Sequence, residues 1–450
     1  MEELENKERK TGLDQHFNFA KLLQFTLPCI GMMVLTSVYS IVDGFFVSNF
    51  AGKNAFAAVN VVMPVLMALS TLGFMVGTGG SALIAFNLGE KNIEKANNIF
   101  SMLVKVLIVS GITLSAIGEI LMPHIVIWLG ATPAIIDDAV LYGRILIISL
   151  TFFMLQNSFQ SFFVAADRAN MGLIVSAVAG VGNMILDFLL VFVFRLGLLG
   201  AAIASASMQI VAGTIPLVYF LRPNKTVLRI GKSKMDWKAL LKTCTNGSSE
   251  LLSNICMSIV SMLYNAQLLK YAAEDGVAAY GVIMYVGFIF SAVFIGFAIG
   301  TGPLFGYQYG AQNFAELKNI LKRSLIMIST AAVFMFFLSE SAALPFAKLF
   351  TGYDEGLCDL TVRAFRIYSF SFLLCGFNIF TSSFFTGLGN GLVSALISFI
   401  RTMIFQTGSV FILPIFLGVN GIWVSVIVAE GLAMILSLSF LFAYRKTYTR

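Results

Sequence analysis

The sequence predicts an all-α integral membrane protein with twelve transmembrane helices in two pseudo-symmetric six-helix bundles. Three observations support this prediction. The 450 residues are 58% hydrophobic and 12% charged, whereas a soluble domain carries about 25% charged residues. The apolar residues stand in runs of roughly 20 or more, the length that crosses about 30 Å of hydrocarbon. Short motifs in the first half of the chain also recur in the second half at a nearly constant spacing.

The apolar runs predict where the helices lie. Clusters of Gly, Pro, Asn and charged residues separate the runs. Strands of about ten residues with alternating polarity, which a transmembrane barrel needs, are not seen. The helices are expected near 22–49, 57–86, 99–122, 140–166, 171–194, 198–221, 241–271, 278–307, 321–350, 360–386, 392–416 and 420–444.

Basic residues indicate how the helices are oriented. If the N-terminus lies inside, most of the 29 Lys and Arg residues fall on the side that holds both termini. Cytoplasmic loops carry such an excess, so the sequence predicts a multi-pass protein of the cell membrane with cytoplasmic N- and C-termini. The same loops account for the net charge of +6, and no nucleic-acid partner is expected. The polar start of the chain predicts no signal peptide.

An internal repeat divides the chain. GFMVGTG at 73–79 recurs as GFAIGTG at 296–302, GLLG at 197–200 matches GVNG at 418–421, and the offset between the matching motifs is nearly constant. We expect an N-terminal lobe at 1–221, a basic cytoplasmic linker at 222–240 and a C-terminal lobe at 241–450. Both lobes begin on the same side of the bilayer, which predicts an axis along the membrane normal and a cavity between the lobes, as in transporters.

Two acids break this symmetry. Asp43 and Asp187 lie at comparable depth in the outer halves of their predicted spans, where a charge costs roughly 2.5–3.5 kcal/mol. Asn183 lies one turn before Asp187 on the same helix face. The second repeat has no acid at these positions, because Asp43 falls opposite Tyr264 and Asp187 near Gly408. We therefore predict a site for H⁺ or Na⁺ in the N-terminal lobe alone.

A third acid is open to two interpretations. Glu430 lies about ten residues into its predicted span, and its repeat partner is Gln209. It is either a functional group of the C-terminal lobe or a polar contact between helices.

The segments SVYSIVDGFFVSNFAG at 37–52, GTG at 77–79 and Asn-x-x-x-Asp at 183–187 resemble the multidrug and toxic compound extrusion (MATE) family, most of all its bacterial multidrug-exporter-A-like branch. The resemblance covers nearly the whole chain. It implies a cation-coupled antiporter, driven by H⁺ or Na⁺, that exports lipophilic, often cationic drugs by rocking of two lobes.

The resemblance also assigns roles to residues. It places the cation-coupling site on Asp43, Asn183, Asp187 and Ser205, and it adds Tyr142 and Gln160 to the cation network. Some members of the family carry a glutamate deep in span seven, where this chain has Met257, or an aspartate in span ten, where it has none. These departures argue against coupling through the C-terminal lobe.

The remaining expectations concern ligands and rivals. Flexible Met and aromatic side chains suit variable drugs, and Phe152, Phe153 and Met154 are expected to line the drug cavity.

The alternative function is a flippase or exporter of lipid-linked or oligosaccharide substrates, which would need several basic residues inside the spans. The sequence shows no Cys/His cluster for a metal site, so we expect no enzyme, no cofactor beyond the coupling ion, no metal beyond Na⁺ at Asp43 and Asp187, and a monomer.

Overall fold

The computed structural model describes residues 12–224, 226–352 and 354–448; the outermost residues of both predicted lobes lie outside these ranges. The regular elements in the described part are all helical. In chain order they are α2 (Phe19–Phe46), η1 (Val47–Ala51), α3 (Lys53–Gly89), α4 (Ile93–Trp128), α5 (Ile136–Ala165), α6 (Ala169–Asp187), η2 (Phe188–Val193), α7 (Gly197–Leu221), α8 (Trp237–Gly310), α9 (Phe314–Thr351), α10 (Glu355–Ser369), α11 (Phe372–Gly387), α12 (Gly391–Phe399), η3 (Ile400–Gln406), α13 (Thr407–Leu417), α14 (Val419–Ala443) and α15 (Arg445–Tyr448), where η marks π-helical segments.

The membrane crossings agree with the predicted fold class. In the described part, ten helices are long and apolar enough to span a bilayer, and α10 with α11 forms an eleventh span bent by 47°. The 74 residues of α8 are interrupted at Ala273, whose φ of 52° and ψ of −147° are not helical. Because Ala273 lies between the runs predicted at 241–271 and 278–307, α8 supplies two of the twelve expected crossings. The all-α membrane fold is thereby confirmed.

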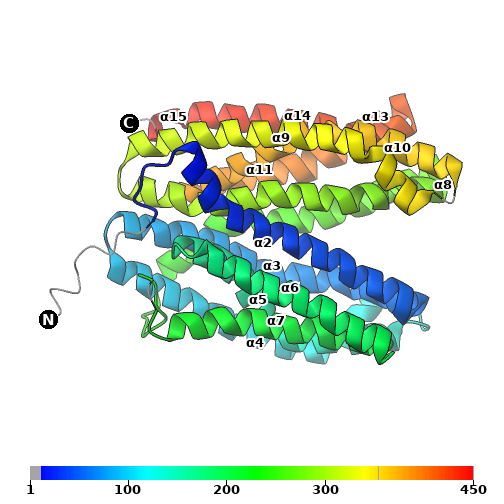
Figure 1. The fold of residues 1–450 in the computed structure, drawn as a ribbon, viewed down its shortest axis with the longest axis horizontal. Coiled ribbons are helices and arrows are strands. Elements are labelled where there is room, and N and C mark those ends of the chain that lie inside the picture. Colours follow the sequence, from blue (N-terminus) through cyan, green and yellow to red (C-terminus); the bar gives the residue numbers. More distant parts are fainter. Residues whose placement is uncertain (1–11, 225, 353, 449–450) are drawn as a thin grey trace.

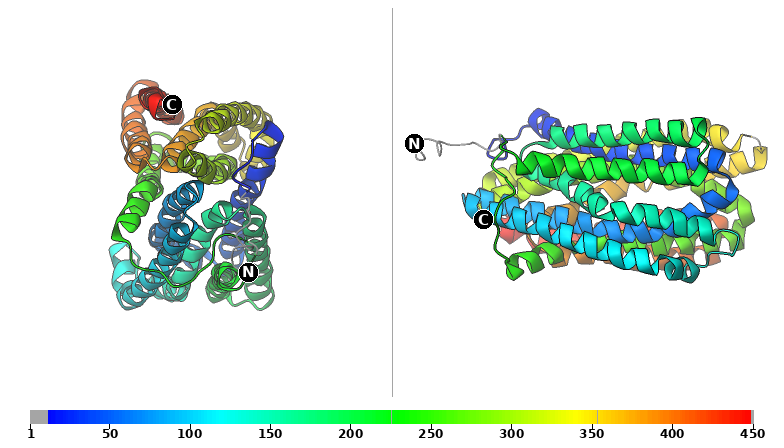
Figure 2. Two further views of the ribbon diagram at one scale, coloured as in Figure 1. Left: turned by 90° about the vertical axis from the view of Figure 1, so that its left-hand side faces the viewer. Right: turned by 90° about the horizontal axis from the view of Figure 1, so that it is seen from below.

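The helices form two groups that run along a common axis. In Figure 1, α3–α7 lie in the lower half of the molecule and α8–α15 mainly in the upper half, while α2 runs obliquely from the upper half into the lower one. The left view of Figure 2, which looks along the helices, shows the same two groups. The segment that joins them docks along α4: the Asn97 side-chain amide donates to the Val227 carbonyl at 3.0 Å, and Lys105 Nζ donates to Ser233 Oγ at 2.9 Å. Lys105, expected inside a span, therefore contacts the linker.

Backbone-to-backbone packing joins the two groups at one end. A Cβ added to Gly79 of α3 would overlap the Thr243 carbonyl, and one added to Gly247 of α8 would overlap the Met75 carbonyl. Gly310 of α8 makes the same kind of approach to the Phe86 carbonyl. Small residues let membrane helices come this close.

An N-terminal strap, residues 12–18, crosses the same end of the molecule. Leu13 and Phe17 are fully buried. The Gly12 amide donates to Asp167 Oδ2 at 2.9 Å, on the loop between α5 and α6. The Phe17 amide donates to Glu316 Oε1 on α9 at 2.8 Å. The strap thus links the two groups of helices.

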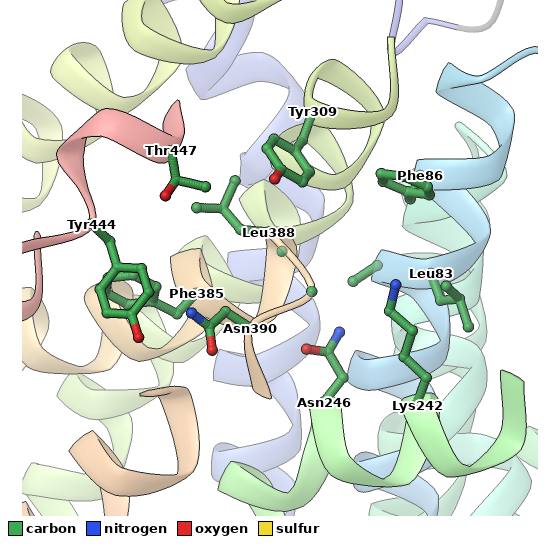
Figure 3. A pocket seen from close by; sticks show the side chains of 13 residues that line it. Leu83, Phe86, Lys242, Asn246, Tyr309, Phe385, Leu388, Asn390, Tyr444 and Thr447 are labelled. Carbon is green, nitrogen blue, oxygen red and sulfur yellow. The ribbon is translucent and has the colours of Figure 1, made fainter. Parts of the chain in front are cut away.

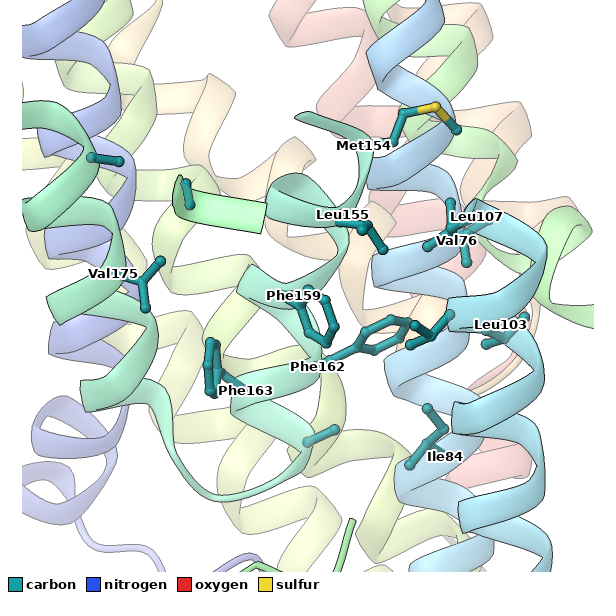
Figure 4. Packing of buried hydrophobic residues seen from close by; sticks show 14 of the residues in the cluster. Val76, Ile84, Leu103, Leu107, Met154, Leu155, Phe159, Phe162, Phe163 and Val175 are labelled. Carbon is teal, nitrogen blue, oxygen red and sulfur yellow. The ribbon is translucent and has the colours of Figure 1, made fainter. Parts of the chain in front are cut away.

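Helix α5 forms the centre of the N-terminal group. Its lower half carries Phe159, Phe162 and Phe163, which pack among Phe100 of α4 and Phe220 of α7 (Figure 4). The Phe159 and Phe220 rings are stacked with centroids 5.7 Å apart. This aromatic core fixes α5 against its neighbours, so the side chains one and two turns earlier on α5 hold fixed positions.

Candidate cation site in the N-terminal lobe

Three helices bring the predicted coupling residues together. Asp43 lies on α2, Asn183 and Asp187 on α6, and Ser205 on α7. The Ser205 hydroxyl donates to Asp43 Oδ1 at 3.3 Å, and Asn183 Nδ2 donates to Ser205 Oγ at 3.4 Å. The sequence separations are 162 and 22 residues. The fold thus assembles a chain of hydrogen bonds in which only Ser205 had been assigned by resemblance alone.

Asp187 is the more deeply buried of the two acids in the candidate site. It is 0% exposed, and neither of its carboxylate oxygens accepts a hydrogen bond from an amide, hydroxyl or basic group of the described residues. Asn183 Oδ1 has no partner there either. Asp43 interacts with Asp187 electrostatically and through a hydrogen bond between the two carboxyl groups, which requires a proton on one of them. Within the described ranges, no Lys, Arg or His forms an ion pair with either acid.

This arrangement can accept a proton or a small cation. A buried charge without a partner is unfavourable, so such a carboxyl group takes up a proton or a counter-ion. Two carboxylates, an amide oxygen and a hydroxyl also form the all-oxygen set that hard cations prefer. The described residues contain no cluster of three or more His, Cys, Asp or Glu side chains, so the set fits H⁺ or Na⁺ better than a transition metal.

Tyr142 and Gln160, both on α5, occupy different places. Tyr142 is fully buried, and its hydroxyl has no hydrogen-bond partner within the described part. Tyr142 interacts electrostatically with both Asp43 and Asp187. Gln160 is buried too, with both amide atoms unpartnered by any described residue. It is not among the side chains that line the cavity beside Asp43, where Gln156, one turn earlier, takes that place.

The cavity beside Asp43 has a volume of about 90 Å³. Phe153 lines it, together with the methionines Met63, Met67 and Met208. Drug-sized ligands need about 300–1,000 Å³, so in this conformation the cavity has room for an ion and a few waters only. Phe152 instead packs against Gly213 of α7, and Met154 points into the hydrophobic core (Figure 4).

Tyr39 and Gln156 are among the lining residues that sequence reasoning missed. A signal for Tyr39 was present, since it precedes Asp43 by four residues and therefore shares its helix face. Gln156 gave a weaker signal, as one of several polar residues in the second half of α5.

A second cavity lies at the end of the molecule that the strap crosses. It has a volume of about 360 Å³ and is lined by Phe86 of α3 and by Lys242, Asn246, Tyr309 and Asn390 of the C-terminal group (Figure 3). Lys242 Nζ stands 5.4 Å from the centroid of the Phe86 ring. None of the described acids lines this cavity, so it is separate from the candidate cation site.

Glu430 is a polar contact between helices. It is 1% exposed, and its Oε1 lies 2.8 Å from Arg401 Nη2. Arg401 Nε lies 2.9 and 3.0 Å from the two carboxylate oxygens, and Asn378 Nδ2 donates to Oε2 at 2.8 Å. This buried acid of the C-terminal lobe therefore already has a cation, in contrast to Asp187.

The chain is similar to known membrane transport proteins. The MatE family model matches residues 28–189 and 251–412. The chain is 23% identical to the multidrug export protein MepA of Staphylococcus aureus (strain MRSA252) and 24% identical to that of Staphylococcus haemolyticus (strain JCSC1435), each over 96% of this chain and 95% of the relative.

Solved structures show the same fold. A crystal structure of MATE in complex with MaL6 has a TM-score of 0.91 at 22% identity, covering 98% of this chain and 99% of that chain. An outward-facing conformation of a multidrug resistance MATE family transporter of the MOP superfamily has a TM-score of 0.91 at 22% identity, covering 98% of each chain.

Proposed function

Because this chain belongs to the MATE family of membrane transporters, which are not enzymes, we propose that it is a cation-coupled antiporter that exports lipophilic, often cationic drugs. The supporting observation is the fully buried Asp187, which has no ion pair and no donor group among the described residues and whose carboxyl group interacts with that of Asp43. A carboxylate without a permanent counter-charge can bind and release a cation. Names of relatives such as multidrug export protein MepA agree with drugs as the cargo.

Exchange at Asp43 and Asp187 couples the ion to the drug. With an ion bound, the N-terminal lobe carries less negative charge and holds a cationic drug less strongly. When the ion leaves, Asp43 and Asp187 are negatively charged again and attract a cationic drug more strongly. An ion that enters down the membrane potential supplies about 2.3 kcal/mol per charge per 100 mV. The Met and aromatic lining of the small cavity suits varied apolar ligands, and we propose that the drug space forms when the lobes move apart.

The moving parts are proposed to be the lobes 1–221 and 241–450, joined by the linker 222–240. The two matches to the family model, at 28–189 and 251–412, each fall within one lobe. Their starting points are offset in the same way as the motifs of the internal repeat. We further propose that both termini are cytoplasmic, as the basic residues indicate, and that the transporter acts as a monomer.

Ethidium efflux from right-side-out membrane vesicles loaded with the dye tests this function. A pH gradient and a sodium gradient are imposed separately on wild type, Asp187→Asn and Asp43→Asn. We expect at least one gradient to drive efflux by wild type and neither to drive efflux by Asp187→Asn. Asp137→Asn, at an exposed acid in the first turn of α5, is the matched control and should transport like wild type.

The same assay separates the alternative. Gradient-driven efflux that persists unchanged in Asp187→Asn would contradict the cation site. Movement of a fluorescent lipid without movement of ethidium would instead favour a flippase. A flippase for polyanionic substrates would need basic residues within the spans, and Lys105 contacts the linker while Arg401 is paired with Glu430.

A further inference from the structure

The two lobes can be aligned residue by residue around the candidate cation site. Helix α6 begins at Ala169 after Asp167, which has a φ of 57°, and α12 begins at Gly391 after Gly389, which has a φ of 75°. Both left-handed turns lie two residues before the helix that follows them. This common break in the backbone fixes the register independently of sequence similarity.

A second pair of turns fixes the register at the opposite end of these spans. Gly197, at the start of α7, has a φ of 55°, and Gly418, just before α14, has a φ of 58°. These are the first glycines of the matching motifs GLLG and GVNG. A π-helical turn contains one more residue than an α-helical turn. The segments η2 and η3 lie at different positions along their spans. The difference in residue number between matching positions of the two spans therefore changes slightly along their length.

In this register, four residues that line the N-terminal cavity have counterparts in the Arg401–Glu430 cluster. All four of these N-terminal residues face the cavity of about 90 Å³. Among the counterparts, three side chains contact the fourth, Glu430. The pairs are Gln156 with Asn378, Ala179 with Arg401, Asn183 with Gln406, and Gln209 with Glu430.

The counterparts form one connected cluster. Arg401 contacts both carboxylate oxygens of Glu430, Asn378 donates to Glu430 Oε2 at 2.8 Å, and Gln406 Nε2 donates to Oε1 at 3.5 Å. Ser437 donates to Asn378 Oδ1 at 3.0 Å. The side chain of Glu430 is 2% exposed and that of Arg401 is 19% exposed. The guanidinium thus occupies the position at which the N-terminal lobe has only the methyl group of Ala179.

We propose that the C-terminal lobe contains a second monovalent-cation site, centred on Glu430, which the guanidinium of Arg401 fills permanently. The N-terminal site binds an exchangeable ion, whereas the cation of the C-terminal site is covalently attached and cannot leave. The ions moved in each transport cycle are therefore set by Asp43 and Asp187 alone. The role given to the N-terminal site rests on the proposed function.

The pair is not required to hold the lobe together. The N-terminal lobe builds the same positions from uncharged Ala179 and Gln209, with Ser149 Oγ donating to Gln209 Oε1 at 2.6 Å. A buried ion pair contributes little net stability compared with well-packed neutral residues, while removal of one partner leaves an uncompensated charge. Loss of the guanidinium should therefore expose a carboxylate that binds a replacement cation.

Glu430 interacts electrostatically with four titratable groups of the described chain. They are Arg401 of η3, Cys375 of α11, Tyr264 of α8 and Tyr368 of α10. None of these four is a second carboxylic acid. Without Arg401, the site would offer one carboxylate and the amides of Asn378 and Gln406, a set that fits a proton or Na⁺.

The test measures ion binding rather than transport. In an Asp43→Asn, Asp187→Asn background, which silences the N-terminal site, the unfolding midpoint Tm of the purified protein is followed against pH and against NaCl, with choline chloride keeping the ionic strength constant. The background protein should show a flat Tm in Na⁺. Adding Arg401→Ala should make Tm rise with Na⁺ or as pH falls, and adding Glu430→Gln as well should abolish that dependence.

Two further variants keep the test decisive. Arg366→Ala removes the partner of Glu340, in a pair with a 3.9 Å separation and a side-chain exposure of 58% for Arg366, and should produce no ion dependence. If Arg401→Ala does not fold, Arg401→Gln replaces it with a neutral side chain that can still donate to Glu430. A Tm of the Arg401 variants that ignores both Na⁺ and pH would overturn the proposal. Because no transport is measured, failure of the efflux assay would not affect this result.

Discussion

The buried tyrosines Tyr142 and Tyr264 differ at their hydroxyl groups. The Tyr142 hydroxyl is buried and has no hydrogen-bond partner among the described residues, and Tyr142 interacts electrostatically with Asp43 and Asp187. Tyr264 of α8 is buried too, but its hydroxyl lies 2.6 Å from Ser425 Oγ. A buried polar atom without a partner costs about 1–3 kcal/mol, so the Tyr142 hydroxyl is in an unfavourable arrangement that the Tyr264 hydroxyl avoids.

Phenylalanine at these two tyrosines should have opposite effects. We expect Tyr142→Phe to leave Tm unchanged or higher, because no hydrogen bond is lost, while ion-driven ethidium efflux falls. We expect Tyr264→Phe to lower the stability by about 0.5–1.5 kcal/mol, the value of one hydrogen bond, with efflux still driven by the gradient. Thermal unfolding and vesicle efflux measure the two effects. A loss of stability in Tyr142→Phe with normal efflux would mean that its hydroxyl is structural.

At the scale of elements, sequence periodicity predicted the spans but not their irregularities. Runs of apolar residues placed the membrane-spanning helices, because span length follows from bilayer thickness. They did not predict the 47° bend between α10 and α11 within the run expected at 360–386, or the short α15. The three π-helical segments were not predicted. One extra residue in a turn depends on what the neighbouring helices accept, and no local pattern records it. Two of these three segments lie at charged residues of the spans: η2 directly follows Asp187, and η3 contains Arg401.

The strap was missed for a similar reason. Leu13 and Phe17 stand in a polar stretch, and their burial depends on partners in the far half of the chain: Gln308 donates to the Leu13 carbonyl at 2.8 Å, and Asn319 donates to the Phe17 carbonyl at 2.9 Å. The coupling residues show the same limit. Depth in the span singled out Asp43 and Asp187, whereas the contact of Ser205 with Asp43 required the fold.

Replacing Glu316 should release the strap. Glu316 accepts from the Phe17 amide and from Asn319 Nδ2, and it lies 2.7 Å from His16 Nδ1. Glu316→Ala removes these acceptors and leaves the Phe17 amide buried without a partner, so we expect faster proteolysis of the N-terminal segment and a loss of about 1–3 kcal/mol in local stability. Limited proteolysis followed by mass spectrometry would show it.

Glu94 supplies the matched control for the strap. It lies in the first turn of α4, where Asn92 caps the helix as Asn313 caps α9, but its side chain is exposed. Glu94→Ala should leave the cleavage rate unchanged. Equal cleavage of the two variants would show that the strap does not depend on Glu316.

At the scale of the whole molecule, the lobes meet at one end through close backbone contacts, in addition to the side-chain contacts of the strap. Gly247 of α8 lies against the Met75 carbonyl, and Gly79 of α3 lies against the Thr243 carbonyl. The strap crosses the same end. If the lobes rock as proposed, this contact must break and reform, and glycines allow it to do so without moving side chains out of the way. We therefore expect this end of the molecule to act as a gate.

Leucine at Gly247 should hold this gate apart. The new side chain would occupy the space of the Met75 carbonyl, and overpacking of this kind costs about 1–3 kcal/mol, which shifts the population toward conformations with separated lobes. Spin labels on cysteines introduced at Asn92 and Asn313, in a variant without the five native cysteines, report the separation by pulsed electron resonance. We expect Gly247→Leu to broaden and lengthen the distance distribution. Gly281→Leu, on the same helix but with nothing within 4 Å of the added Cβ, should match wild type. If Gly247→Leu gives the same distances as Gly281→Leu, close glycine packing does not control the gate.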